Sequence, residues 1–141
     1  MPSGVKMGFE GEIYYGVAGS TAGTKLTNSR DITYNSDPTK GETTVRGDGS
    51  APPIETERVV SVKFSIEWLM LRRTDASLEA LIAAAVVGTP VAIRTKDFAA
   101  GKGFDGDMTL SMKHGAPYKG EQTYAFTATV TDELRTPQPY V

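Results

Sequence analysis

The sequence predicts a mainly β fold with one α-helix: an antiparallel β-sandwich or partly closed barrel, flanked by the helix. Several segments alternate apolar and polar residues with a period of two, as strands with one buried face do, while one segment has helical spacing. Glycine accounts for 15 of the 141 residues, above the usual share of about 7 %, which indicates many turns. This length suits one domain, residues 1–141, with a single core.

The N-terminal part is predicted to hold a flexible arm and two strands. The arm is expected over residues 1–10. The stretch "EIYYGVAG" (12–19) has strand composition and is followed by the turn cluster "STAG". A second strand is expected in "KLTNSRDITYNS" (25–36), where Leu26 and Ile32 are the apolar anchors.

Residues 37–57 are predicted to form a long exposed loop. The stretch "DPTKGETTVRGDGSAPPIETE" has three prolines, three glycines and few apolar residues, although "TTVRG" (43–47) fits a short strand. Loops of this length in compact domains are usually functional or mobile.

The stretch "VVSVKFSIEW" (59–68) predicts a strand with one dry and one wet face. The apolar positions are Val60, Val62, Phe64, Ile66 and Trp68. The polar positions are Ser61, Lys63, Ser65 and Glu67. The dry face is expected in the core, and the surroundings of the wet face are the functional question.

One helix is predicted within "RRTDASLEALIAAAVVGTP" (72–90). Helical spacing places on one face Leu78, Leu81, Ile82, Ala85 and Val86. Thr74 or Asp75 can cap its start, and Gly88 and Pro90 end it. The alanines at 83–85 allow close packing against a sheet.

The C-terminal part predicts three more strands and a tail. The strands are "VAIRT" (91–95), "FDGDMTLSMK" (104–113) and "EQTYAFTATVTDE" (121–133), and loops with the glycine or proline of a turn connect them. The tail, residues 133–141, carries two prolines and is expected to extend away from the body.

The residue inventory argues against catalysis and metal binding. The chain has no cysteine, and its one histidine, His114, is expected in a solvated turn. Asp105 and Asp107 do not fit a calcium loop and favour a polar hairpin, while Gly-Lys-Gly at 101–103 lacks the rest of a phosphate-binding loop. A net charge of −2 provides no general attraction to nucleic acid. We expect no enzyme activity and no cofactor.

The order of these segments resembles the tail tube proteins, or major tail proteins, of long-tailed bacteriophages. The stretches that carry the resemblance, over residues 10–132, are "GVAGSTAGTKLTNSRDITYN", "TTVRGDG", "VVSVKFSIEW", "DASLEALIAAAVVGTPVAI", "GFDGDMTLSMKHG" and "YAFTATVTDE". No single motif among them is diagnostic. The resemblance implies hexameric rings that stack into a hollow tube through which the genome passes. Tube proteins of contractile tails and of type VI secretion have a similar fold.

The resemblance also implies partners and a location. The partners are other copies of the chain and the tape measure, tail terminator and tail tip proteins, and DNA transits the lumen without specific binding. The chain is expected in the virion tail and, during assembly, in the host cytoplasm; neither a signal peptide nor a membrane span is visible, so no membrane role is expected.

Two sets of residues are candidates for the tube's surfaces. The candidates for the lumen are Ser61, Lys63, Ser65, Glu67, Thr127 and Thr129. Small polar side chains would form a wall without the stacking aromatics or dense arginine that hold DNA. The long loop and both termini are expected between rings, with candidates Arg46, Asp48, Glu55 and Glu57.

Other readings of the sequence remain open. The wet strand face can be an ordinary solvent-facing sheet surface. The chain can be the tube protein of a phage-derived or type VI-like injection system, a capsid decoration or tail terminator protein, or a β-sandwich binding module using the "RGDG" loop (46–49). An adhesin would need export and clustered aromatic residues, and a small enzyme has little support from the residue inventory.

Overall fold

The computed structural model describes residues 4–45 and 54–141, without the side chains of 41–45 and 54–57. The elements are η1 (Gly8–Glu10), β1 (Glu12–Val17), β2 (Thr24–Lys25), β3 (Ser29–Val45), β4 (Ile54–Leu71), α1 (Ala76–Val87), β5 (Val91–Lys96), β6 (Asp105–Gly115) and β7 (Thr123–Thr131). The predicted class, a mainly antiparallel fold with one flanking helix, is confirmed for this part of the chain.

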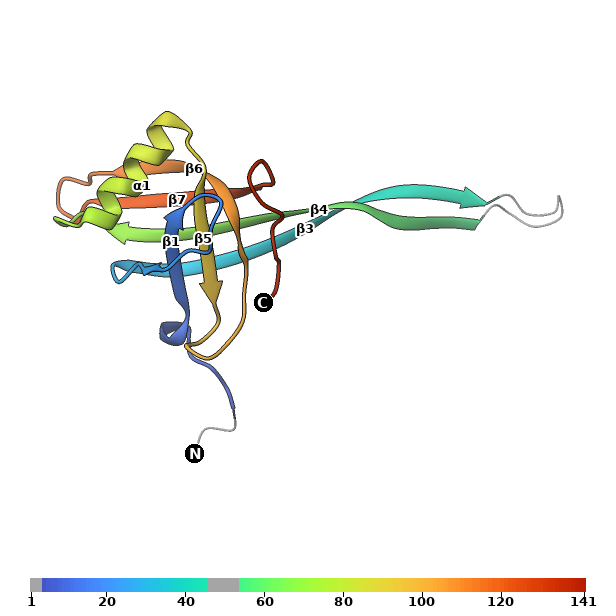
Figure 1. The fold of residues 1–141 in the computed structure, drawn as a ribbon, viewed down its shortest axis with the longest axis horizontal. Helices are drawn as coiled ribbons and strands as arrows, with labels where there is room; N and C mark the ends of the chain where they lie inside the picture. Colours follow the sequence, from blue (N-terminus) through green and yellow to red (C-terminus); the bar gives the residue numbers. More distant parts are fainter. Residues whose placement is uncertain (1–3, 46–53) are drawn as a thin grey trace.

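The strands form one antiparallel sheet in the order β2-β1-β5-β6-β7-β4-β3. The sheet curls, so that β1 and β5 cross in front of β3 and β4 (Figure 1). Strand β6 joins the two parts, because its residues 105–108 pair with β5 and residues 107–115 pair with β7. Of the two predicted arrangements, the structure therefore adopts the partly closed barrel.

The core fills the inside of the curl. Its fully buried members include Ile13, Ile66, Trp68, Leu78, Phe104, Met108 and Phe126. Trp68 of β4 and Phe126 of β7 are cross-strand partners, and their rings stack with centroids 5.4 Å apart. Ile66 and Trp68 thus confirm the dry face expected for this strand.

Helix α1 begins and ends where the sequence predicted. The Asp75 carboxylate accepts a hydrogen bond from the Ser77 backbone N–H, and Gly88 ends the helix in the left-handed conformation. Leu78 and Leu81 are buried, and Ala84 packs close to the core. Val86, predicted to lie on the buried face, is exposed, because the buried residues Leu78, Leu81 and Ala84 follow one another at intervals of three and their face points away from Val86.

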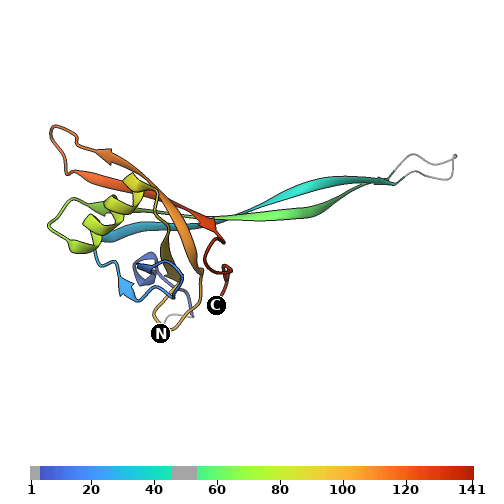
Figure 2. The ribbon, with the colours of Figure 1, turned by 45° about the horizontal axis from the view of Figure 1, so that its top comes forward.

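The prediction of a loop over residues 37–57 is wrong for its described part. Residues 37–45 of β3 pair with residues 54–63 of β4 in a two-stranded ribbon that projects far from the body (Figure 2). Hydrogen bonds between adjacent strands hold this hairpin together and require no buried face. The predicted contacts Arg46 and Asp48 lie outside the described residues, whereas the backbone of Glu55 and Glu57 belongs to β4.

The dry face of β4 is also shorter than predicted. Val60 is 68 % exposed and Val62 41 % exposed, because this part of the strand has already left the body. A register shift pairs Thr39 with Ser61 and Lys40 with Val59, leaving Val60 as the bulged residue.

The C-terminal tail returns to the body and does not extend away from it. Gly103 and Val141 exchange backbone hydrogen bonds of 2.9 and 3.1 Å, and Asp105 and Gln138 do the same at 2.8 and 2.9 Å. The tail thereby covers the side of residues 103–105 that β7 leaves unpaired. The N-terminal arm ends in η1, and its flexibility stays a prediction.

Candidate assembly surfaces

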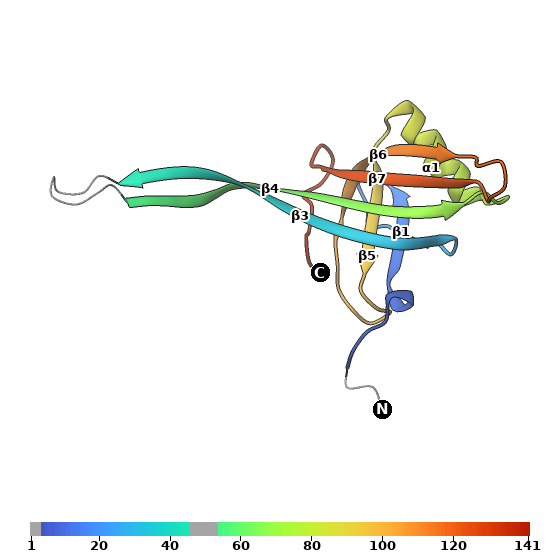
Figure 3. The same ribbon diagram turned by 180° about the vertical axis from the view of Figure 1, so that it is seen from behind.

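The polar residues of the central strand lie on one broad face of the sheet. Strands β6, β7, β4 and β3 are consecutive in the sheet, and their outer face is turned to the viewer in Figure 3, with α1 behind it. Ser65 is the cross-strand partner of Thr129, and Glu67 is the partner of Thr127. The register therefore brings four of the six predicted lumen residues together.

The other two, Ser61 and Lys63, continue this face where the hairpin leaves the body. Lys63 pairs with Asp37 of β3, so the charge at this position has an opposite neighbour. The face is completed on the neighbouring strands by Thr33, Asn35, Thr109, Ser111 and Lys113. We call these residues, together with the six candidates and Asp37, the polar face.

The polar face offers few groups that would hold a passing polymer. None of the residues so named is aromatic or arginine, although Arg30, the cross-strand partner of Leu69, lies at the end of the same sheet face beyond Thr33 and Glu67. The hydroxyl of Thr109 donates to the Thr129 carbonyl at 3.5 Å, and that of Ser111 donates to the Thr127 carbonyl at 3.4 Å, so both donors are directed at the sheet itself. The polar face carries both lysine and carboxylate charges, so it has no uniform positive potential that would attract a nucleic acid.

The four strands under the polar face are open at both edges within the described part of the chain. Strand β3 ends the sheet on one side. On the other side, β5 pairs only with residues 105–108 of β6, so residues 109–115 have no strand beyond them. Because neighbouring strands alternate in direction, β3 and β6 run antiparallel. Another copy's β6 beside β3 would therefore continue the antiparallel sheet.

A buried ion cluster fastens the tail to β6. Arg135 reaches the Asp107 carboxylate through Nε at 2.9 Å and the Asp105 carboxylate through Nη1 at 3.1 Å. The backbone N–H of Gly19 donates to both oxygens of Asp107, at 3.1 and 3.0 Å. Burial alone would lower the pKa of Arg135, but the hydrogen bonds and charges of the two aspartates raise it.

Sequence reasoning missed this cluster. Asp105 and Asp107 were expected in a polar hairpin, yet both are buried on β6, because the tail and the turn around Gly19 cover them. The one signal for this cluster in the sequence was the presence of two aspartates on the same side of a predicted strand, Asp105 and Asp107, together with a single arginine in the tail. Among the described residues, no group of three or more acidic, histidine or cysteine side chains could hold a metal ion.

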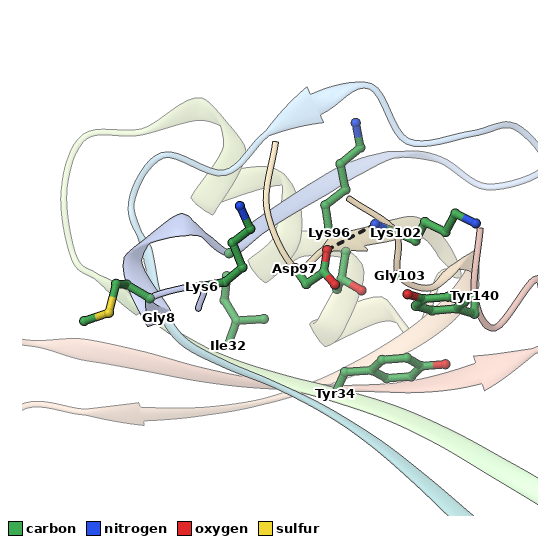
Figure 4. A pocket seen from close by; sticks show the side chains of 12 residues that line it. Lys6, Gly8, Ile32, Tyr34, Lys96, Asp97, Lys102, Gly103 and Tyr140 are labelled. Carbon is green, nitrogen blue, oxygen red and sulfur yellow. Dashed lines mark hydrogen bonds between the residues drawn. The ribbon is translucent and has the colours of Figure 1, made fainter. Parts of the chain in front are cut away.

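A hollow of about 460 Å³ lies beside the N-terminal arm (Figure 4). Tyr34 and Tyr140 form one wall, and three lysines stand around it. Each lysine is set over a different ring: Lys6 over Phe98 at 4.2 Å, Lys96 over Tyr14 at 5.5 Å and Lys102 over Tyr140 at 5.7 Å. Because each ammonium group lies over its own ring, the contacts of the three lysines do not define a common anion site.

His114 is exposed, as predicted, but it lies in β6 and not in a turn. Its ring stacks on Tyr124 with centroids 4.4 Å apart, and Nε2 lies 3.0 Å from the Gln122 side-chain oxygen. No helix in the described part of the chain is long and apolar enough to cross a bilayer.

Solved structures of viral-type tails share this fold. A chain from the tail of an empty gene transfer agent (GTA) particle with C6 symmetry is 13 % identical, with a TM-score of 0.76 over 96 % of this chain and 98 % of that one. A chain from the native GTA virion is also 13 % identical, with a TM-score of 0.63 over 97 % and 99 % of the two chains. The SPP1 tail tube gives 16 % identity and a TM-score of 0.58 over 89 % of this chain and 76 % of that one.

The chain has the fold of these tail proteins. Neither models of protein families nor curated protein sequences match the sequence. At identities of 13–16 % the similarity concerns the path of the backbone and not individual residues.

Proposed function

We propose that this protein is a structural tail tube subunit, which assembles into hexameric rings that stack into a conduit. The observation that carries the proposal is the polar face on a four-stranded sheet open at both edges. The same fold occurs in a GTA tail with C6 symmetry and in the SPP1 tail tube, which supports a ring of six. The role is that of a building block and not that of an enzyme.

The open edges define how neighbours meet within a ring. In Figure 1 the strands descend in the order β6, β7, β4, β3, so the two open edges lie on opposite sides of the body. A contact between β3 of one copy and residues 109–115 of β6 in the next is heterologous, so each copy uses both edges. Such a contact either closes into a ring or continues as a filament. Six copies would join their sheets into one closed wall.

The polar face then lines the lumen. The curl of each subunit places α1, β1 and β5 on the opposite side of the sheet, which would face outward. The serines and threonines of the polar face, with Lys63 and Glu67, would provide a hydrophilic wall without stacking surfaces. DNA would pass it without specific binding.

The hairpin of β3 and β4 provides the contact between rings. The hairpin continues in the direction of the strands that carry the polar face. This direction is perpendicular to the line from one open sheet edge to the other, along which ring neighbours would follow one another. From Asp37 to Val45 it spans roughly 30 Å, enough to reach well into an adjacent ring. This placement supports the assignment of Glu55 and Glu57, with Arg46 and Asp48 of the adjoining segment, to ring stacking.

The proposed assembly also implies partner proteins and a location. A tube of this kind would also contact a tape measure protein, a tail terminator and tail tip proteins. It would reside in the virion after assembly in the host cytoplasm. The same architecture would serve a phage-derived injection system, and the nature of the cargo separates the two.

Electron microscopy of concentrated protein tests the proposal. We expect rings or tubes with six-fold symmetry and a central channel, together with polydisperse species in sedimentation velocity that increase with protein concentration. Single particles at every concentration and salt, also with the other tail components added, would rule the proposal out.

A further inference from the structure

We propose that residues 5–9 of one copy dock into an apolar groove at the far end of β1 on the neighbouring copy. The groove is about 570 Å³ in volume and is lined by Tyr15, Val17, Ala80, Pro90, Val91 and Leu134. This inference rests on the proposed ring and specifies a second contact in it, separate from the sheet edges.

The N-terminal arm presents three exposed apolar side chains close together in the sequence. Val5, Met7 and Phe9 follow one another at every second position, and all three are exposed, Phe9 to 85 %. Lys6 and Glu10 between and beside them are engaged elsewhere, since Lys6 lies over the Phe98 ring and the Glu10 carboxylate accepts from the Met7 backbone N–H. The apolar side chains are thus left to face solvent in the single subunit.

The groove is the matching surface. No charged side chain lines it, and Val17, at its edge, is 81 % exposed. Val87, two helical turns beyond the lining residue Ala80 on the same side of α1, is also largely exposed, as is Leu134 of the tail, which lines the groove. Exposed apolar residues that gather around an apolar groove mark a binding surface more often than isolated ones do.

The arm and the groove of one copy lie apart in the structure. The arm precedes Glu12, where β1 begins, and the groove surrounds Val17, where β1 ends, so the length of the strand separates them. In Figure 1 the N-terminus lies below the body, whereas the end of β1 and the last turn of α1 lie at its upper side. The complementary surfaces are therefore on opposite ends of the molecule.

The direction from the groove to the arm is the same as the direction from the open edge of β6 to the open edge of β3, along which ring neighbours would follow one another. The open edge of β6 lies at the same upper side as the groove, and the open edge of β3 lies at the same lower side as the arm. One displacement that brings β3 of one copy to β6 of the next also carries its arm toward the groove. A second copy of this chain is therefore the occupant that the geometry supports, with Phe9 as the largest anchor.

Cysteine cross-linking tests this contact, because the wild-type chain has no cysteine. The variant with both Phe9→Cys and Val87→Cys is assembled under reducing conditions and then oxidised. We expect a ladder of covalent multimers on non-reducing gels. The single variants should give no ladder. The matched control pairs Phe9→Cys with Tyr118→Cys, a residue that is 99 % exposed in the β6–β7 turn, and it should remain monomeric.

A substitution provides an independent readout. Phe9→Asp should raise the protein concentration needed for assembly about tenfold or more, as expected for an interface anchor, while Trp68 fluorescence stays unchanged. Tubes that form normally without the Phe9–Val87 ladder, or with an equal ladder from the Tyr118 control, overturn the docking of the arm but leave the tube intact. A wild-type chain that never assembles overturns both proposals.

Discussion

Removing the Arg135 side chain should destabilise the subunit strongly. Arg135 balances two aspartates whose side chains are almost fully buried, 7 % exposed for Asp105 and 0 % for Asp107. Arg135→Ala leaves these carboxylates in the interior without a countercharge. Breaking a buried ion pair in this way costs about 3–5 kcal/mol of the free energy of unfolding.

Chemical denaturation followed by fluorescence measures this loss. Trp68 is the one tryptophan of the chain and is 1 % exposed, so its emission reports on the core directly. The matched control is Arg72→Ala, which breaks the exposed pair with Glu79 at 2.9 Å and should cost less than about 1 kcal/mol. The triple variant Arg135→Met, Asp105→Asn, Asp107→Asn removes the buried charges together and should recover part of the stability.

The stability losses of Arg135→Ala and Arg72→Ala, compared with each other, show whether the tail docks on β6. Equal small losses for Arg135→Ala and Arg72→Ala would show that the tail does not dock on β6. The tail would then extend from the body, as its prolines suggested, and the reasoning from the buried cluster would be refuted.

Three further predictions concern the hairpin, the lumen and the pH dependence of stability. Replacing residues 42–57 by an Asn-Gly turn should leave a folded subunit that forms rings but no tubes in electron microscopy; normal tubes would exclude the hairpin from stacking. In assembled tubes, Ser65→Cys and Thr127→Cys should react with small thiol reagents and be protected from reagents too large for the channel, and full access to the large ones would place the polar face outside. The pKa of Glu12 is lowered by the Tyr14 hydroxyl at 2.6 Å and by Lys25, so its contribution to stability is fully present above the ordinary value of 4.5 and is lost as the pH falls through the lowered pKa. Glu12→Gln should therefore reduce stability at pH 7, and this loss should shrink as the pH is lowered through the acidic range; a loss that does not change with pH would contradict this.

The elements that the sequence predicted correctly are those with local signals. Asp75 and Gly88 set the ends of α1 through hydrogen bonds within a turn of the chain. Ile66 and Trp68 alternate with polar neighbours, so the buried face of β4 was visible without knowing its partners. That Ser65 and Thr127 belong to one polar face required the strand order, which depends on contacts between distant segments.

The predictions that failed depend on those long-range contacts. Residues 37–40 and 58–63 of the ribbon are exposed in the subunit, although Val60 and Val62 continue the alternating pattern of a buried strand, so the pattern does not show where β4 leaves the core. Pro38 reads as a loop signal, yet it is tolerated in β3 because this strand is the sheet edge. The docked tail depends on Arg135 meeting two aspartates about 30 positions earlier in the chain, and no local rule connects them.

Cross-linking of the two sheet edges tests the central claim most directly. Asn35→Cys on β3 and Ser111→Cys on β6, combined in one otherwise cysteine-free chain, should join copies in sequence on oxidation and give a ladder that ends at six. Neighbouring positions on the same face, Thr33 and Lys113, cover the alternative registers between copies. An equimolar mixture of the two single variants should stop at dimers made from unlike variants. Assembled particles that yield no ladder with any of these pairs would contradict a sheet shared between subunits.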